Sequence, residues 1–250
     1  MHLDDNCQLI CATILTGVYD VNRNELLRPD DFSIVQQWYD AVVRLGLRGI
    51  VFHNTFSAAT VAAHENECVS FVSVDYDGIL NANAFRYIIY HKFIGQYAAK
   101  IANIFVTDIA DVEVVHNPFI QPLFRANPTS LFCGDEPAVL NNEWMIDHST
   151  HLRNAIPLFA QYENNNAQQV LLNCGIIGGS VSVMRELTGQ LAAIHRAHTV
   201  SNRTPYTLDM GAFNFVARTV FGARLVHGAP VNTQFKGYET DRTDCWFRHK

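Results

Sequence analysis

The stretch IFVTDIADVEVVHNPF, residues 104–119, decides the fold that this chain predicts. It begins as an apolar β-strand that runs directly into Asp108, and Asp111 follows just before a valine-rich segment that contains Glu113. Open α/β sheets bind ligands at the carboxyl ends of their parallel strands, so acids at this point predict a site. Carboxylates are hard oxygen ligands that suit Mg²⁺ or Mn²⁺. The spacing is equally compatible with one aspartate that caps a turn and another that is solvated.

Before this stretch, short apolar runs alternate with helical patterns, as they do in a parallel sheet with crossover helices. The pattern predicts strands at 8–17, 48–54, 67–76 and 103–108, and helices at 28–46 and 81–103. Asp30 or Asp31 is the expected N-cap of the first helix, and Gly46 is its expected end. The first half of the chain therefore predicts an α/β fold.

After the stretch the pattern is less regular. It predicts strands at 130–137, 168–180 and 223–228, and helices at 183–198 and 206–222. The chain divides near residue 120, but we expect one continuous sheet and a single domain over residues 1–250.

Composition narrows the possible classes of protein. The chain has 250 residues, of which 48% are hydrophobic and 17% charged, and this fits one α/β domain with a large core. The net charge is −6 and the pI about 6.0, so no basic field exists to hold nucleic acid or an anionic membrane. No apolar run approaches the roughly 18 to 20 residues of a transmembrane helix.

The start of the sequence and the cysteines predict a cytoplasmic protein. The acidic start MHLDDNCQ lacks the basic beginning of a secretory signal. The six cysteines are scattered, and no pair has the spacing of a zinc site. We therefore expect free thiols in a reducing compartment.

Four segments, taken in order, resemble one family. TDIADVEVVHNPF is similar to the acid motif of GT-A glycosyltransferases, in which a strand ends in D-x-D. Here the motif is D-x-x-D, with Asp111 matching the second acid and Asp108 displaced by one residue. LLNCGIIGGS, residues 171–180, resembles the N-[SA]-G strand of the glycogenin-like and lipooligosaccharide galactosyltransferase-like enzymes.

The other two segments lie nearer the C-terminus. LDMGAFN, residues 208–214, resembles the D-Q-x-x-x-N helix start of the same enzymes, with Met210 in place of the glutamine. VHGAPVNTQFKGYE, residues 226–239, resembles their H-x-x-G-x-x-K region, in which the histidine is a metal ligand. His227 and Lys236 match that histidine and that lysine loosely.

The resemblance implies a GT-A fold, which is a Rossmann-like, mixed and mainly parallel sheet flanked by helices. It implies a nucleotide-binding half over about residues 1–120 and an acceptor-binding half over about 121–250. The implied activity is metal-dependent transfer of a sugar from a nucleoside diphosphate sugar to a glycan or another hydroxyl acceptor. The implied cofactor is a divalent metal, Mn²⁺ or Mg²⁺. The similarity to glycogenin-like enzymes favours a reaction that retains the anomeric configuration. An inverting enzyme would need a carboxylate base, for which Asp209, Asp135 and Glu136 are candidates.

Residue roles follow from the same resemblance. The implied metal ligands are Asp108, Asp111 and His227, and the implied catalytic residues are Asp209 and Asn173. The implied donor-binding residues are Thr16, Tyr19, Arg86, Gly178, Gly179 and Lys236.

Each of these residues also has an ordinary structural explanation. Gly175, Gly178 and Gly179 fit a tight turn. Asp209 fits a helix N-cap, and Arg86 fits a surface salt bridge. A single histidine beside glycine, such as His227, is more often structural than metal-bound. Among the tryptophans, Trp144 is expected to pack in the core and Trp246 to line an acceptor site.

Three other classes remain as alternatives. A sugar-nucleotidyltransferase would carry a Gly-rich, basic loop after the first strand, which TGVYDVNRN at 16–24 is not. An aspartate-based phosphatase would carry its acids after the first strand rather than the fourth. A non-catalytic nucleotide-sugar-binding protein would bind the donor without turnover.

Overall fold

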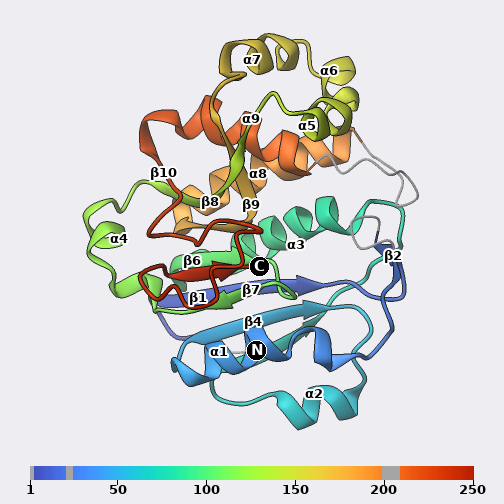
Figure 1. Ribbon diagram of the computed structural model, residues 1–250. Coiled ribbons are helices and arrows are strands. Elements are labelled where there is room, and N and C mark those ends of the chain that lie inside the picture. The colour runs from blue at the N-terminus through green and yellow to red at the C-terminus, as the bar shows by residue number, and fades with distance from the viewer. Residues whose placement is uncertain (1–2, 21–24, 199–208) are drawn as a thin grey trace.

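The computed structural model describes residues 3–20, 25–198 and 209–250, and it is an α/β fold. A seven-stranded sheet has the strand order β10-β8-β9-β6-β1-β4-β5. Neighbouring strands are parallel except at β9, which runs antiparallel to both β6 and β8. The expected class, a Rossmann-like, mainly parallel mixed sheet flanked by helices, is confirmed (Figure 1).

The main strands lie where the apolar runs predict them. They are β1 (Cys7–Ile14), β4 (Arg48–His53), β5 (Val69–Ser73), β6 (Ile101–Thr107), β8 (Leu131–Val139), β9 (Val170–Ser180) and β10 (Leu225–His227). Parallel strands that are covered on both faces need apolar side chains on both, which is why they read as continuous apolar runs. The sheet continues across residue 120, because β6 and β9 are neighbours in it.

Helices cover both faces of the sheet. On one face, α3 (Ala82–Tyr97), α8 (Val181–Ala197) and α9 (Asp209–Phe221) pack in the same core as Leu9 and Cys11 of β1. On the other face, α1 (Gln36–Arg44) packs in the same core as Ile10 and Ala12. Successive side chains of β1 point to opposite faces of the sheet, so the strand contributes residues to both cores.

Several short elements were not predicted from the sequence. They are α2 (Ala58–His64), α4 (Pro122–Ala126), α5 (Glu143–His148), α6 (Thr150–Ala155), α7 (Phe159–Asn166), the hairpin strands β2 (Tyr19–Asp20) and β3 (Glu25–Leu26), and the 3-10 turns η2 (Pro118–Ile120) and η3 (Gly222–Arg224). The helix expected at 28–46 is shorter than predicted, because α1 begins only at Gln36 and the 3-10 turn η1 (Phe32–Ile34), which Asp31 caps, precedes it. The group formed by α5, α6 and α7 lies between β8 and β9 in the sequence, and Figure 1 shows it beyond one end of these strands.

The C-terminal residues return to the acidic stretch. β11 (Phe247–His249) pairs antiparallel with β7 (Val112–Val114), which directly follows Asp111. The backbone nitrogen of Lys250 donates to the carbonyl oxygen of Asp111 at 3.0 Å. In Figure 1 the C-terminus accordingly lies beside β7, against the sheet.

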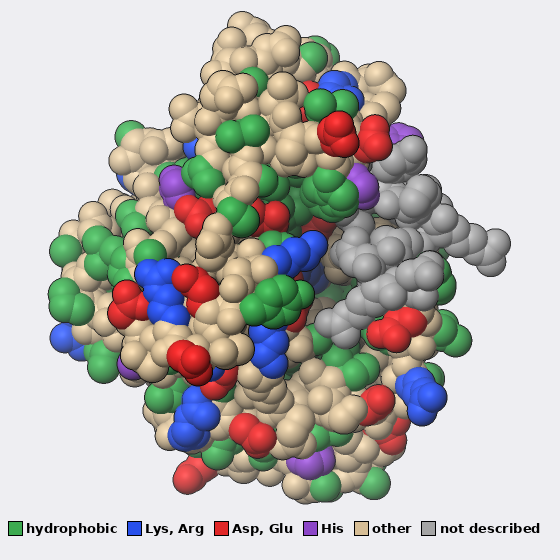
Figure 2. Space-filling view, viewed as in Figure 1, with side chains coloured by type: hydrophobic (Ala, Val, Ile, Leu, Met, Phe, Trp, Pro, Cys, Tyr) green, Lys and Arg blue, Asp and Glu red, His purple; other side chains and the backbone are tan. Residues whose placement is uncertain are grey.

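Acidic and basic side chains are interspersed on the face drawn in Figure 2. Within the described ranges, every helix is too short or too polar to span a bilayer.

Candidate functional site

A cleft of about 710 Å³ opens at the carboxyl ends of β1, β6 and β8. The amino-terminal half of β9 lies at the same edge because that strand runs antiparallel to its neighbours. The volume falls within the range of about 300–1,000 Å³ that is usual for small-molecule sites. This edge is where an open α/β sheet is expected to bind its ligand.

Three side chains in the cleft could hold a metal ion, and we call these three residues the metal group. Asp108, Asp111 and His249 each place one potential ligand atom so that these atoms lie within 4.8 Å of one another. Asp108 directly follows β6, and its backbone nitrogen donates to the carbonyl oxygen of Gly175 at 2.7 Å. His249 lies opposite Val112 in the β7–β11 pair, and Val112 is the residue that follows Asp111. The two short strands therefore bring the histidine to the acids.

The state of His249 fits a metal ligand. Its side chain is 1% exposed, and neither ring nitrogen has a hydrogen-bond partner in the part of the chain that the structure describes. Burial disfavours the imidazolium form and lowers the pKa of His249 to about 4. The ring is therefore neutral at physiological pH, with a lone pair available. Two carboxylates and one imidazole suit Mn²⁺, and the carboxylates alone suit Mg²⁺.

Gly175 leaves the space in which these side chains meet. A Cβ atom at this position would lie 2.6 Å from Cε1 of His249 and 2.7 Å from Oδ2 of Asp108. Both separations are shorter than any van der Waals contact between such atoms. Only glycine fits here without displacing a member of the group.

Arg86 connects the metal group to Asp209. Its guanidinium is buried, and Nη1 contacts Oδ1 of Asp108 while Nη2 lies 3.2 Å from Oδ2 of Asp209. The expected surface salt bridge is therefore a buried one at the cleft. A buried charge of this kind needs its partners, because removal of one leaves the other uncompensated.

Asn173 and Glu136 form a second polar pair in the cleft. Nδ2 of Asn173 donates to Oε1 of Glu136 at 2.8 Å, and Oδ1 of Asn173 accepts from the backbone nitrogen of Gly175 at 2.6 Å. Burial raises the pKa of Glu136, and the hydrogen bond from Asn173 opposes that rise. Asn173 thus orients a carboxyl group that lines the same cleft as Asp108, Asp111 and His249.

Asn214, which matches the helix-start motif, has a structural role. Its side-chain amide hydrogen-bonds both backbone groups of Leu172, at 3.0 and 2.8 Å, and so fastens α9 to β9. This contact keeps Asp209, the first residue of α9, at the cleft.

The structure does not bring His227 to the metal group. Nδ1 of His227 lies 2.9 Å from Oδ2 of Asp135, and neither residue lines the cleft. His249 occupies the position that the sequence assigned to His227.

Gly178 and Gly179 also lie away from the cleft. Because β9 runs antiparallel to β6, they pair with Phe105 and Ile104, whereas the cleft lies at the Asn173 end of the strand. A Cβ atom on Gly178 would lie 2.2 Å from the ring of Phe105, so this glycine permits the ring to cross the sheet face closely.

The remaining donor-binding candidates divide in the same way. Tyr19 and Lys236 line the cleft. Thr16 is 2% exposed, and its backbone exchanges hydrogen bonds of 2.9 Å with the side chain of Asn54. Thr16 therefore holds the loop after β1 in place rather than facing a ligand.

Sequence reasoning missed His249 and the stack of Trp144 on His148, and it grouped Gly175 with Gly178 and Gly179 without separating their roles. The sequence offered no signal for His249, because burial of a polar residue within CWFRHK, residues 245–250, is visible only in the structure. Trp246, expected at an acceptor site, is 2% exposed in the core.

A comparison with protein-family models found no match, and a search of curated proteins found none either. The observed fold and site therefore define an α/β protein with a polar cleft and a candidate cation site.

Proposed function

We propose that this protein is a metal-dependent glycosyltransferase, which moves a sugar from a nucleoside diphosphate sugar to a glycan or another hydroxyl acceptor. One observation carries the proposal. The group of Asp108, Asp111 and His249 lies at the carboxyl edge of the sheet, inside a cleft large enough for a nucleotide sugar. The order of the four sequence motifs supports the same activity.

The β1 side of the cleft suits a nucleoside. Ile14, Leu15 and Val18 line this end together with Tyr19, and β1 lies next to β6 in the sheet. Apolar and aromatic side chains cover the flat faces of a base, and the diphosphate would then reach Asp108 and Asp111.

The charge chemistry of the cleft suits departure of a diphosphate. When bound, the divalent cation would neutralise negative charge as the anomeric bond breaks. Lys236 lines the same cleft and adds a positive charge to it. Arg86, through its contacts to Asp108 and Asp209, fixes the orientation of both carboxylates. A donor sugar beside these groups would contact Asp209 and Asn173.

The stereochemical outcome depends on which carboxylate faces the anomeric carbon. Asp209 and Glu136 line the cleft and are the available candidates for a general base in an inverting reaction. Asp135 is paired with His227 outside it. The resemblance to glycogenin-like enzymes favours retention.

Calorimetric titration with UDP, GDP and their sugars, each with and without Mn²⁺, tests the proposal. We expect one diphosphate to bind only when the metal is present. Asp111→Ala and His249→Gln should each weaken this binding by more than about tenfold. Loss of a residue that only orients a metal ligand already lowers metal affinity by that factor. His227→Gln is the matched control and should bind as the wild type does, because His227 contacts Asp135 instead.

Two outcomes would change the assignment. If no nucleoside diphosphate binds under any metal condition, the glycosyltransferase proposal fails. If a nucleotide sugar binds with metal but is neither transferred nor hydrolysed, the protein is a nucleotide-sugar-binding protein instead.

A further inference from the structure

The cleft has a second end, on the side of β6 away from β1, where α5 presents an aromatic side chain. Trp144 lines the cleft and is 42% exposed, whereas Trp38 and Trp246 are 0% and 2% exposed. Large aromatic side chains contribute most to the stability of a fold when they are buried. An indole left open inside a polar cleft is therefore available to a ligand.

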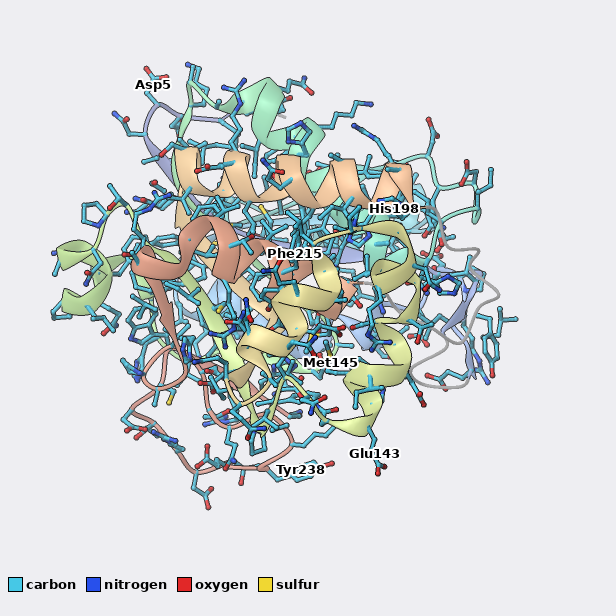
Figure 3. All side chains as sticks on the ribbon, turned by 90° about the horizontal axis from the view of Figure 1, so that it is seen from above. Asp5, Glu143, Met145, His198, Phe215 and Tyr238 are labelled. Atoms are coloured by element: carbon cyan, nitrogen blue, oxygen red, sulfur yellow. The ribbon has the colours of Figure 1, made fainter. Side chains whose placement is uncertain are left out.

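The indole of Trp144 is held in a fixed orientation. The side chain of Asn142 caps α5 by accepting from the backbone nitrogen of Met145 at 3.0 Å, and Met145 is buried. Figure 3 shows Met145 towards the body of the molecule and Glu143 at its periphery, so the core anchors the helix by one side. His148 stacks on Trp144 with ring centroids 4.0 Å apart and planes 19° from parallel. Because His148 covers one face of the indole, a ligand would use the opposite face.

Hydrogen-bonding groups line the same cleft as this aromatic face. Asn142, Glu136 and Asn173 line the same cleft. Glu136 and Asn173 are already joined by a 2.8 Å hydrogen bond and so form a fixed polar edge. A flat apolar face beside fixed polar groups matches a pyranose ring, which has C–H groups on its faces and hydroxyl groups around its rim.

The opposite ends of the cleft then serve different ligands. In the sheet, β8 and β9 lie on one side of β6 and β1 lies on the other. Asp108, which follows β6, therefore stands between the apolar end formed after β1 and the end formed by α5. A ligand on Trp144 would approach Asp209 and Asn173 from the side away from the nucleoside.

We propose that Trp144, stacked on His148, is an acceptor subsite and that the acceptor is a carbohydrate whose ring lies on the indole. The inference rests on the proposed function and selects a saccharide from among the hydroxyl acceptors. A lipid tail would need a wider apolar surface than one indole face. A saccharide needs one aromatic face, which α5 provides, and polar groups in the same cleft, which β8 and β9 provide through Glu136 and Asn173.

Tryptophan fluorescence tests the inference directly in the full-length protein. Since Trp38 and Trp246 are buried, acrylamide quenching reports mainly on Trp144. Methyl glycosides of glucose, galactose, mannose and N-acetylglucosamine, and the corresponding disaccharides, are the probes. We expect at least one of them to shift the emission and to protect Trp144 from acrylamide.

Variants locate the binding by calorimetry. Trp144→Ala should weaken the active saccharide about tenfold, while Trp144→Phe, which keeps an aromatic face, should retain much of the affinity. Ile146→Ala is the matched control, because Ile146 is 43% exposed on the same helix and lies outside the cleft lining. Metal-dependent binding of the nucleoside diphosphate should be the same in all three variants.

The outcomes separate this inference from the proposed function. If a diphosphate binds with Mn²⁺ but no saccharide affects Trp144, the carbohydrate subsite is overturned and the donor site stands. If a saccharide protects Trp144 and no diphosphate binds, the subsite is upheld and the glycosyltransferase assignment falls. Equal saccharide affinity in wild type and Trp144→Ala also overturns the inference.

Discussion

Gly175 is the single residue on which the geometry of the metal group depends most directly. Its missing side chain is the space that Asp108, Asn173 and His249 share. Its carbonyl oxygen also accepts from the backbone of Asp108 at 2.7 Å. Gly175 thus positions one candidate ligand, Asp108, through the backbone and makes room for another, His249.

We expect Gly175→Ala to weaken Mn²⁺ binding at least about tenfold, because the new methyl group would displace His249 or Asp108. Gly95→Ala is the control, since a Cβ atom there meets no other atom within 4 Å. Mn²⁺ affinity measured by calorimetry, alongside thermal unfolding, checks this. Unchanged Mn²⁺ affinity in a folded Gly175→Ala protein would contradict the assigned metal group.

At the scale of the element, the pair formed by β7 and β11 supports the site. Phe247 is 0% exposed, and its ring centroid lies 5.2 Å from that of Phe105 in the core. Arg248, on the other side of the strand, lies 2.7 Å from Glu113. The strand is therefore anchored by a core contact and an ion pair, and His249 is carried to the acids as a result.

We expect Phe247→Ala to lower the free energy of unfolding by about 3–5 kcal/mol, as for other buried phenylalanines. Mn²⁺ affinity should fall as well, because β11 no longer holds His249 rigidly. Urea unfolding and calorimetry measure the two effects. His249→Gln offers the contrast, since it should lose metal affinity with little loss of core packing. A Phe247→Ala protein with full Mn²⁺ affinity would show that β11 does not position the ligand.

Prediction from sequence succeeded for long elements and failed for short ones. The buried runs at 8–17 and 103–108 and the start of the helix predicted at 81–103 specify their structures locally, because apolar periodicity is enough. The end of that helix was wrong, since α3 ends at Tyr97 and β6 begins at Ile101. β11 has three residues, and its partner β7 lies more than 130 residues earlier, so no local pattern reveals it. For the same reason the sequence pointed to His227, whose ring lies against Asp135, and did not point to His249, which the structure places beside Asp108 and Asp111.

The direction of β9 explains the other difference within the site. A strand reads as an apolar run whether it is parallel or antiparallel, so the sequence does not say which of its ends meets the cleft. Antiparallel pairing with β6 brings Asn173 and Gly175 to the cleft and leaves Gly178 and Gly179 in the sheet. Acids that follow a parallel strand do not have this ambiguity, and Asp108 and Asp111 were found correctly at the carboxyl edge.

At the scale of the whole molecule, burial of neutral histidine links stability to pH. His195 on α8 is 1% exposed, stacks on Tyr87 with centroids 5.5 Å apart, and has no hydrogen-bond partner for either ring nitrogen among residues 3–20, 25–198 and 209–250. Burial, followed by the charges of Arg86 and His198, lowers the pKa of His195 from 6.5 to about 3. His195 therefore becomes protonated near pH 6.5 in the unfolded chain, but only near pH 3 in the folded chain.

Since the unfolded state binds more protons in this window, stability must fall as the pH drops below about 6.5. At pH 5 the proton bound by His195 in the unfolded state alone costs about 2 kcal/mol of folding free energy. We expect His195→Phe to remove this part of the pH dependence, so that its stability relative to wild type is about 2 kcal/mol more favourable at pH 5 than at pH 7. Urea unfolding at both pH values measures the difference, and exposed His151→Phe serves as the control. Parallel pH profiles for wild type and His195→Phe would mean that His195 is protonated in the folded protein, which would require an acidic partner for its ring.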